Sequence, residues 1–337
     1  MTSQAVSPDR IMQLGDAFKS AKTLLSAVEL GVFTALAGGP LDAVALRTRI
    51  NIHERGARDF FDALVALKLL DRDDRGRYAN TPETACYLDR GKPGYIGGAF
   101  ELRNARQYGP WSSLSEALRS GKPQSGARGS GNFDAYYADP KVRDNVVKGM
   151  TGGVRAVAEA VAAKFPWHSY RTFFDIGAAE GALPVAIARA HPHLTGGGFD
   201  LPAVGTLFDA YVAEHGLPDR LRFVPGDFFV EAFPNADVLI LGRVLHNWDL
   251  RIKTMLLTKA YDALPKDGVL IVYESLIDDA RRENAQALLA SLNMLVISEG
   301  GFDFSGADCI GWMRDVGFRD MRIESLTTGY SMVVARK

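Results

Sequence analysis

The chain has 337 residues, of which 47% are apolar and 23% are charged, a composition typical of a globular protein and unlike that of a disordered one. Its 39 Lys and Arg residues almost balance its 40 Asp and Glu residues, which argues against a polyanion partner held by bulk charge. The only two cysteines, Cys86 and Cys309, exclude a disulfide framework and a metal site built from several cysteines.

The length predicts the number of domains, and the N-terminal sequence and the apolar segments predict where the protein resides. At roughly 100–200 residues per domain, a chain of this size predicts two domains. The first residues lack the basic start and apolar core of a secretory signal. No stretch reaches the roughly 18 uninterrupted apolar residues that cross a bilayer. We therefore expect a cytoplasmic protein.

The first hundred residues predict a helical module that ends in a hairpin. Residues 10–37 carry apolar side chains at helical spacing, and the Gly-Gly-Pro sequence at 38–40 is expected to end that helix. Helices over 41–50 and 53–70 follow, and then a polar tip around Gly76 flanked by short extended pieces predicts a hairpin. Helix, helix and hairpin in this order are typical of a winged helix.

A winged helix either binds DNA or packs against another part of a protein. Residues 1–100 hold 13 Lys and Arg against 12 Asp and Glu. The helix over 53–70, in the position of a DNA-recognition helix, mixes both signs of charge and offers no basic stripe. We therefore favour a packing interface, and keep a winged-helix, ligand-sensing transcription regulator as the alternative from a different class.

Residues 100–165 predict connecting helices interrupted by one loose segment. The stretch 120–132 is rich in Gly and Ser, and Phe133, Tyr136 and Tyr137 follow it. A flexible loop beside aromatic side chains is either a cover for a ligand pocket or a solvent-exposed insertion. Both interpretations stay open at this point.

From residue 171 onward, strands and helices alternate. Five short apolar segments predict strands, in the order RTFFDIG, TGGGFDL, LRFVPGDFF, ADVLILGRVL and GVLIVYESL, and helical patterns separate most of them. Such alternation is typical of right-handed βαβ units, so we predict an α/β fold with a doubly wound, mostly parallel sheet. The last segment reads as two strands around 327–329, which predicts an antiparallel hairpin at the sheet edge.

Ligands of an open α/β sheet bind beyond the carboxyl ends of its strands, which directs attention to the residues after each strand. Small residues from Gly177 to Gly181 let a ligand approach the backbone, and a helix N-terminus follows them. Asp200 can accept hydrogen bonds from both ribose hydroxyls, or it can cap the next helix. Asp227 precedes two aromatic residues that suit an adenine ring. Together these strand ends predict a nucleoside site.

The cofactor type is constrained by the spacing of the first loop. It reads G-x-x-x-G, whereas nicotinamide enzymes carry G-x-G-x-x-G. A nicotinamide-dependent dehydrogenase is therefore the weaker alternative for this half of the chain.

His246 and Glu274 follow the fourth and fifth predicted strands. An imidazole with an ordinary pKa of about 6.5 is the natural general base at neutral pH. If the two strands are neighbours, Glu274 can hold the imidazole N–H and stabilise the imidazolium. The alternative is that His246 only begins a helix and makes a local hydrogen bond. Judged together with the nucleoside site, the catalytic interpretation is favoured.

The ordered segments FFDIGAAEG, FDLP, VPGDFF, LGRVLHNWD and ALPKDGVLIVYESLIDD resemble those of S-adenosylmethionine-dependent small-molecule O-methyltransferases. This is the two-domain type that includes plant caffeic acid O-methyltransferase and bacterial polyketide O-methyltransferases, and the resemblance covers nearly the whole chain. It implies a winged-helix dimerisation domain at 1–105, connecting helices at 106–165 that help to enclose the acceptor, and a Rossmann-like class I methyltransferase domain at 166–337.

The resemblance also implies partners and site residues. The cofactor would be S-adenosyl-L-methionine, and the protein would be a homodimer that acts on a small molecule, without metal, nucleic acid or membrane. Gly177 would line the methionine part of the cofactor, Asp200 would hold the ribose, and Asp227 with Phe228 would frame the adenine. The full set of implied cofactor contacts is Gly177, Asp200, Leu201, Gly226, Asp227, Phe228 and Arg243.

In the same way, the resemblance assigns the chemistry. His246 matches the family's base and Glu274 matches one of its two acidic partners. Asp303 stands where the second partner is usually a Glu, and its shorter side chain puts its reach in question. Met150, Asn293 and Met294 fall where relatives clamp the acceptor.

The first loop departs from the family pattern. Ala178 and Ala179 replace glycines of the first loop, so we expect that loop to follow a slightly different path, because alanine tolerates positive φ poorly. The predicted activity is O-methylation of a small aromatic or polyketide-like hydroxyl compound, with N-, S- or C-methylation as the alternatives.

Overall fold

The computed structural model describes residues 6–92, 94–125, 137 and 140–337, except for the side chains of 140–142, 145, 146, 148–150 and 152. The chain divides into two compact units, residues Met1–Ala105 and Arg106–Lys337. No helix in the described ranges is both long and apolar enough to span a membrane.

The first unit contains mostly helices and one small sheet. Its elements are α1 (Asp9–Glu29), α2 (Val32–Ala35), α3 (Ala43–Arg49), α4 (Glu54–Ala66), β1 (Leu70–Arg72), β2 (Tyr78–Asn80) and α5 (Pro82–Tyr87), followed by α6 (Gly97–Arg106) at its boundary. Strands β1 and β2 pair antiparallel, so two helices and a hairpin occur in the predicted order. The core forms where α1, α2, α3 and α4 bury side chains such as Val28, Phe33, Leu46 and Phe61.

Two predicted boundaries in this unit are wrong. The single helix over 10–37 is broken, because Gly31 adopts a φ of 72° that ends α1 and caps α2. The helix predicted to run to Leu70 ends at Ala66, and Leu70 begins β1. Lys68, with a φ of 63°, makes that turn. Apolar spacing alone did not detect either change of direction.

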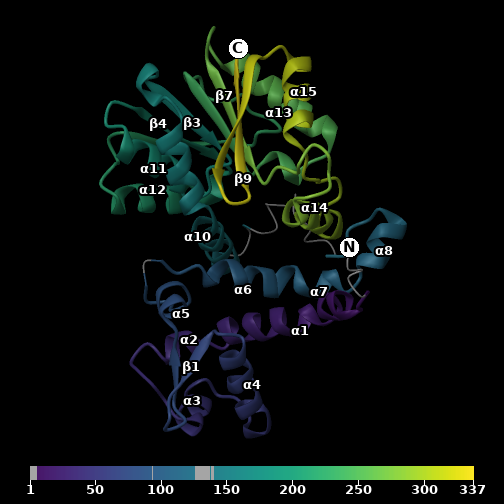
Figure 1. Ribbon diagram of the computed structural model, residues 1–337. Coiled ribbons are helices and arrows are strands. Elements are labelled where there is room, and N and C mark those ends of the chain that lie inside the picture. Colours follow the sequence, from purple (N-terminus) through teal and green to yellow (C-terminus); the bar gives the residue numbers. More distant parts are fainter. Residues whose placement is uncertain (1–5, 93, 126–136, 138–139) are drawn as a thin grey trace, which may run out of the picture. The chain divides into compact units, whose positions relative to one another are not determined.

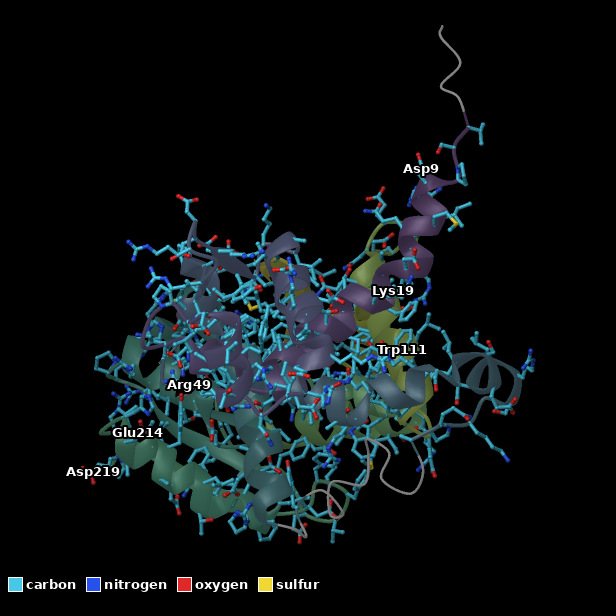
Figure 2. All side chains as sticks on the ribbon, turned by 90° about the horizontal axis from the view of Figure 1, so that it is seen from below. Asp9, Lys19, Arg49, Trp111, Glu214 and Asp219 are labelled. Atoms are coloured by element: carbon cyan, nitrogen blue, oxygen red, sulfur yellow. The ribbon has the colours of Figure 1, made fainter. Side chains whose placement is uncertain are left out.

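The first half of α1 exposes apolar side chains. Ile11, Leu14 and Phe18 are 74%, 68% and 57% exposed, and Met12 is 62% exposed. Burial within the unit begins only at Leu25. In Figure 2 the stretch from Asp9 to Lys19 extends beyond the other helices of its own unit. The helical spacing of these apolar residues therefore does not reflect burial within this unit.

The second unit is built around a seven-stranded sheet in the order β5-β4-β3-β6-β7-β9-β8. The strands are β3 (Thr172–Ile176), β4 (Thr195–Asp200), β5 (Leu221–Pro225), β6 (Val238–Gly242), β7 (Val269–Glu274), β8 (Arg319–Thr327) and β9 (Tyr330–Arg336). Strands β3 to β7 pair in parallel, whereas β9 pairs antiparallel with both β7 and β8. The predicted doubly wound sheet with a C-terminal hairpin at its edge is confirmed.

The other described elements of the second unit are helical. They are α7 (Tyr108–Trp111), α8 (Leu114–Ser120), α10 (Pro140–Lys164), α11 (Ala182–Ala190), α12 (Gly205–Glu214), α13 (Leu250–Ala263), α14 (Ala285–Ile297) and α15 (Gly306–Val316), with short 3-10 turns η2 (Trp167–Ser169), η3 (Pro202–Val204) and η4 (Leu245–Asn247). In Figure 1, α11 and α12 lie on one face and α13 and α15 on the other.

Each face has its own apolar core, because successive strand residues point to opposite faces. Phe173 and Ile240 pack with α10, α11 and α12, whereas Phe174 and Leu241 pack with α13 and α15. The chain order reverses between the neighbouring strands β3 and β6, which is the switch point at which such sheets bind ligands. The loops after β3, β4, β6 and β7 therefore meet at one edge.

Candidate active site

His246 and Glu274 meet at the carboxyl edge of the sheet. His246 lies on the η4 turn after β6, and Glu274 ends the adjacent strand β7. The imidazole Nδ1 is 2.8 Å from Glu274 Oε2, and the His246 backbone N–H donates to Glu274 Oε1 at 3.3 Å. Both side chains are buried. The carboxylate therefore favours the tautomer that carries its proton on Nδ1 and leaves Nε2 free to accept one.

Asp303 joins this pair in spite of its shorter side chain. One nitrogen of His246 and one carboxylate oxygen from each of Glu274 and Asp303 lie within 4.8 Å of one another. Burial raises the pKa of the Asp303 carboxyl to about 6, and the charge of His246 opposes that rise. One imidazole and two carboxylates could also bind a divalent cation. However, Nδ1 of His246 is in hydrogen-bond contact with Glu274, which is the arrangement of an acid–base pair.

The first loop and Asp200 are joined by backbone hydrogen bonds. Asp200, at the end of β4, accepts from the N–H of Ala179 at 2.8 Å and from that of Leu201 at 2.7 Å. It does not cap α12, whose first turn follows Val204. Ala179 has a φ of 49°, so the alanine adopts the unfavourable left-handed conformation and aims its N–H at the carboxylate. Burial raises the pKa of Asp200 to about 6.

Gly177 at the switch point stands where a larger residue would be strained. It has a φ of 82°, and a Cβ placed on it would come within 2.8 Å of a Val244 methyl group. Beneath it, Asp175 on β3 is buried, and its burial together with the charge of Asp200 raises its pKa to about 8. Two buried carboxyl groups with raised pKa values thus lie near Gly177.

Aromatic side chains surround the region after β5. The Trp248 ring lies edge-on to Phe228 and Phe229, with ring centres 5.7 and 4.9 Å apart. Trp248 Nε1 is buried and has no hydrogen-bond partner among the residues that the structure describes. An unpaired indole N–H beside aromatic faces fits a flat heterocycle with acceptor nitrogens, such as adenine. Asp227 is half-buried nearby and accepts from the Phe229 N–H at 2.8 Å.

The remaining predicted cofactor residues lie around this edge. Gly226 is buried, and a Cβ there would come within 2.5 Å of the Phe199 ring. Arg243, after β6, has a φ of 55° and donates to the hydroxyl of Tyr330 on β9. Burial acts to lower the pKa of the guanidinium, but Tyr330 and Glu274 raise it overall, so Arg243 remains charged.

The predicted acceptor residues are described only in part. Asn293 and Met294 lie on α14, where Met294 is buried. Asn293 Oδ1 accepts a hydrogen bond from Trp111 Nε1 at 2.9 Å, which ties α14 to α7. The side chain of Met150 lies outside the described part of the structure, as do Phe133, Tyr136 and residues 126–132 of the predicted loop.

Four of these residues were not singled out from the sequence. Asp175 lies within an apolar strand, and an acidic side chain in such a strand could have indicated a functional residue. Trp248 follows His246 in the same motif and could have been found from that position. Nothing in the sequence connects Trp111 to Asn293, or Tyr330 to Arg243, because each pair is far apart along the chain.

Comparisons with known proteins identify the family of this chain. The profile of the O-methyltransferase domain matches residues 111–319, and that of the O-methyltransferase dimerisation domain matches residues 12–90. The tetracenomycin polyketide synthesis 8-O-methyl transferase TcmO of Streptomyces glaucescens is 41% identical over 330 residues, which cover 98% of this chain and 97% of that protein.

Two further relatives extend the comparison. The N,N-dimethyltransferase OxyT of Streptomyces rimosus is 36% identical over 331 residues, covering 97% of this chain and 96% of OxyT. The crystal structure of human N-acetylserotonin methyltransferase in complex with SAM superposes with a TM-score of 0.91 at 28% identity. It covers 100% of this chain and 99% of the human one.

Proposed function

The chain belongs to the O-methyltransferase family and is an S-adenosylmethionine-dependent methyltransferase, and we propose that it methylates a hydroxyl of a small aromatic or polyketide-like metabolite with His246 as the general base. The observation that carries this proposal is the buried contact of 2.8 Å between His246 Nδ1 and Glu274. It leaves Nε2 as the proton acceptor at the edge of the sheet where the family binds its cofactor.

Proton removal and bond formation are coupled in this proposal. The acceptor O–H bond breaks and its proton goes to His246 Nε2. The oxygen electron pair would form the new bond to the methyl carbon while the bond from that carbon to the cofactor's sulfur breaks, so that S-adenosylhomocysteine would be the leaving group. A phenol of pKa about 10 and an ordinary imidazole of pKa about 6.5 differ by roughly 5 kcal/mol at about 1.4 kcal/mol per unit. Since methyl transfer makes the oxygen cationic, the proton can leave as the C–O bond forms. Glu274 stabilises the imidazolium that results.

The cofactor is held by residues of the switch point. When bound, S-adenosylmethionine supplies a methyl group already activated on a sulfonium. Asp200 would accept the ribose hydroxyls, and Phe228 with Trp248 would enclose the adenine. Gly177 would line the methionine part, near the buried Asp175. Arg243 would contact the cofactor, and its bond to Tyr330 fixes its direction.

The relatives and helix α14 support this acceptor class. TcmO is named for O-methylation in polyketide synthesis, which supports a hydroxyl of an aromatic or polyketide-like compound as the acceptor. Asn293, held by Trp111, and the neighbouring Met294 would contact that ring. OxyT is named an N,N-dimethyltransferase, so an amine acceptor is the second candidate. We propose that the protein works as a homodimer through its first unit.

A methyl-transfer screen tests this function. Radiolabelled S-adenosylmethionine is incubated with phenols, hydroxyquinones, aromatic amines and thiols, and the product is identified by mass spectrometry. The proposal expects O-methylated aromatic product with wild-type protein and a loss of at least about 100-fold with His246→Ala. Methyl transfer only to amines or thiols would contradict O-methylation and indicate an N- or S-methyltransferase.

A further inference from the structure

Lys253 is a fully buried lysine that the proposed mechanism does not use. It lies on α13 and is 0% exposed, although lysine is almost never fully buried unless it is paired. Its ammonium donates to the carbonyl oxygen of Trp248 at 2.7 Å and to that of Phe302 at 3.0 Å. It also lies 3.1 Å from the centre of the Phe302 ring, with Phe304 and Trp312 farther off at 5.4 and 5.8 Å.

The two carbonyl groups belong to the two segments that carry the proposed base and its acidic partner. Trp248 lies two residues after His246, and Phe302 immediately precedes Asp303. Lys253 therefore bridges the backbone after His246 to the backbone before Asp303. A cation that binds both segments at once fixes their separation.

The same two segments are in close backbone contact. A Cβ on Gly301 would come within 2.7 Å of the His246 carbonyl oxygen and 2.9 Å of the Asn247 carbonyl carbon. The Gly301 N–H donates to Ser298 Oγ at 3.0 Å, and the Asp303 N–H donates to Ser291 Oγ at 3.2 Å. Lys253 thus bridges two segments that are already in close contact, and its charge interacts with the carboxylates of Glu274 and Asp303.

The charged and titratable groups that act on Lys253 come from every neighbouring element. They are Glu274 of β7, Asp303 of the segment before α15, Asp249 at the start of α13 and Cys309 of α15. Burial lowers the pKa of Lys253 to about 7, and the three carboxylates oppose that lowering. The charges that favour the ionised form of Asp303 are, largest first, those of His246, Arg243 and Lys253.

We propose that Lys253 is a positioning residue for the acid–base group, whose ammonium ties the His246 and Asp303 segments together and holds Asp303 in place beside His246 and Glu274. The inference rests on the proposed function, because it assigns Lys253 to the same methyl transfer. Without this cation, two buried carboxylates would face each other with less compensation, and Asp303 would take up a proton. The imidazolium formed during the reaction would then lose one of its stabilising charges.

Lys253→Met tests the proposal, because methionine keeps an unbranched apolar chain against the rings and removes the charge. We expect kcat to fall about tenfold while KM for S-adenosylmethionine changes less than about twofold. The acid limb of the kcat–pH profile is expected to move to higher pH by about half a unit or more. In protein labelled with ¹³C-aspartate, the pH midpoint of the Asp303 carboxyl ¹³C titration should also move to higher pH. The Asp303 signal is assigned by its loss in Asp303→Asn.

Lys337→Met is the matched control. Lys337 also donates to two carbonyl groups, those of Asp262 and Leu264, and lies 4.7 Å from the centre of the Tyr261 ring. It follows Arg336, which pairs with Val269 at the opposite end of β7 from Glu274. Its loss should lower stability by a similar mechanism and leave the acid limb unmoved.

The outcomes are separable. If the Lys253→Met acid limb and the Asp303 midpoint both coincide with wild type, the proposal is overturned, whatever the change in melting temperature. If the variant does not fold, Lys253→Gln, which retains a donor, is measured in the same way. ¹⁵N NMR of the wild-type Lys253 side chain adds a test without substitution, since a neutral amine near pH 6 would overturn the proposal. If wild type transfers no methyl group, the proposed function fails, while the two NMR readouts still decide the role of Lys253.

Discussion

Glu274 holds His246 twice, through the ring Nδ1 at 2.8 Å and through the backbone N–H at 3.3 Å. One carboxylate thus fixes both the backbone position of His246 and the orientation of its ring. The arrangement depends on the register of β6 and β7, in which Gly242 pairs with Tyr273 and the two strands end side by side. Removing one group from a buried hydrogen-bonded pair leaves the other uncompensated.

Glu274→Gln should therefore reduce methyl transfer without abolishing cofactor binding. The amide can still accept a hydrogen bond but no longer stabilises an imidazolium, so we expect kcat to fall by about 100-fold, or roughly 2.7 kcal/mol. Steady-state kinetics measure the fall, and calorimetry with S-adenosylhomocysteine should give an affinity within about threefold of wild type. Glu283→Gln, on an exposed segment after the same strand, is the control. An unchanged kcat for Glu274→Gln would contradict the pairing.

Asp200 predicts a pH-dependent cofactor affinity. Its pKa is raised to about 6, so acidification through that value protonates the carboxyl and weakens its hydrogen bonds from ribose hydroxyls. We expect S-adenosylhomocysteine to bind about tenfold more weakly near pH 5 than near pH 7.5. In Asp200→Asn the affinity should be low at both values. Asp209→Asn, an exposed change on α12, should behave as wild type in calorimetry. A flat pH profile for wild type would remove Asp200 from the ribose site.

The sequence was sufficient to predict the second unit and insufficient for the details of the first. The strands that end at Asp200, Pro225 and Glu274 alternate with helical segments, and the carboxyl ends of neighbouring parallel strands lie at one edge of the sheet. The break at Gly31 depends on a single positive φ inside a continuous apolar pattern, so periodicity did not reveal it. Lys253 lies in a stretch that reads as the polar face of a helix, and only packing shows it to be buried.

Contacts between distant segments were also beyond prediction. Asn293 was predicted to contact the acceptor, but its bond to Trp111 requires α7 to pack on α14. Ala179 was expected to alter the first loop, because alanine disfavours a positive φ. It adopts that φ nonetheless, and the hydrogen bond to Asp200 compensates. The cost of a local conformation can be read from the sequence, whereas the partner that offsets it comes from the fold.

Asp278 predicts a pH dependence of stability at the turn before α14. Its carboxylate accepts from the backbone N–H groups of Arg282, Glu283 and Asn284, and these bonds lower its pKa to about 2. A lowered folded-state pKa stabilises the protein above the ordinary value of about 4, and the contribution is lost as pH falls toward 2. Asp278→Asn should lower the melting temperature at pH 7 and by less near pH 3.5. Asp219→Asn, on an exposed turn, is the control for calorimetric melting, and equal effects of Asp278→Asn at both pH values would contradict this account.

The exposed apolar face of α1 predicts the behaviour of the proposed homodimer. Phe18 is 57% exposed and lies on the same helix as the exposed Ile11 and Leu14. Leu14 and Phe18 lie within residues 12–90, which match the dimerisation domain, and Ile11 immediately precedes them. Burying a charge in an interface of this kind is costly, so Phe18→Glu should shift the protein toward monomer. Light scattering after size exclusion measures the shift. Val44→Glu alters a side chain of similar exposure, 63%, on α3 and should leave the mass unchanged.

The central claim is that His246 removes the acceptor proton. Single-turnover methyl transfer by His246→Gln, at saturating acceptor and cofactor, tests it most directly, because glutamine keeps a polar side chain of similar size but cannot take up a proton at neutral pH. The account predicts a single-turnover rate at least about 100-fold below wild type, with S-adenosylhomocysteine binding retained. A rate within about threefold of wild type would contradict it.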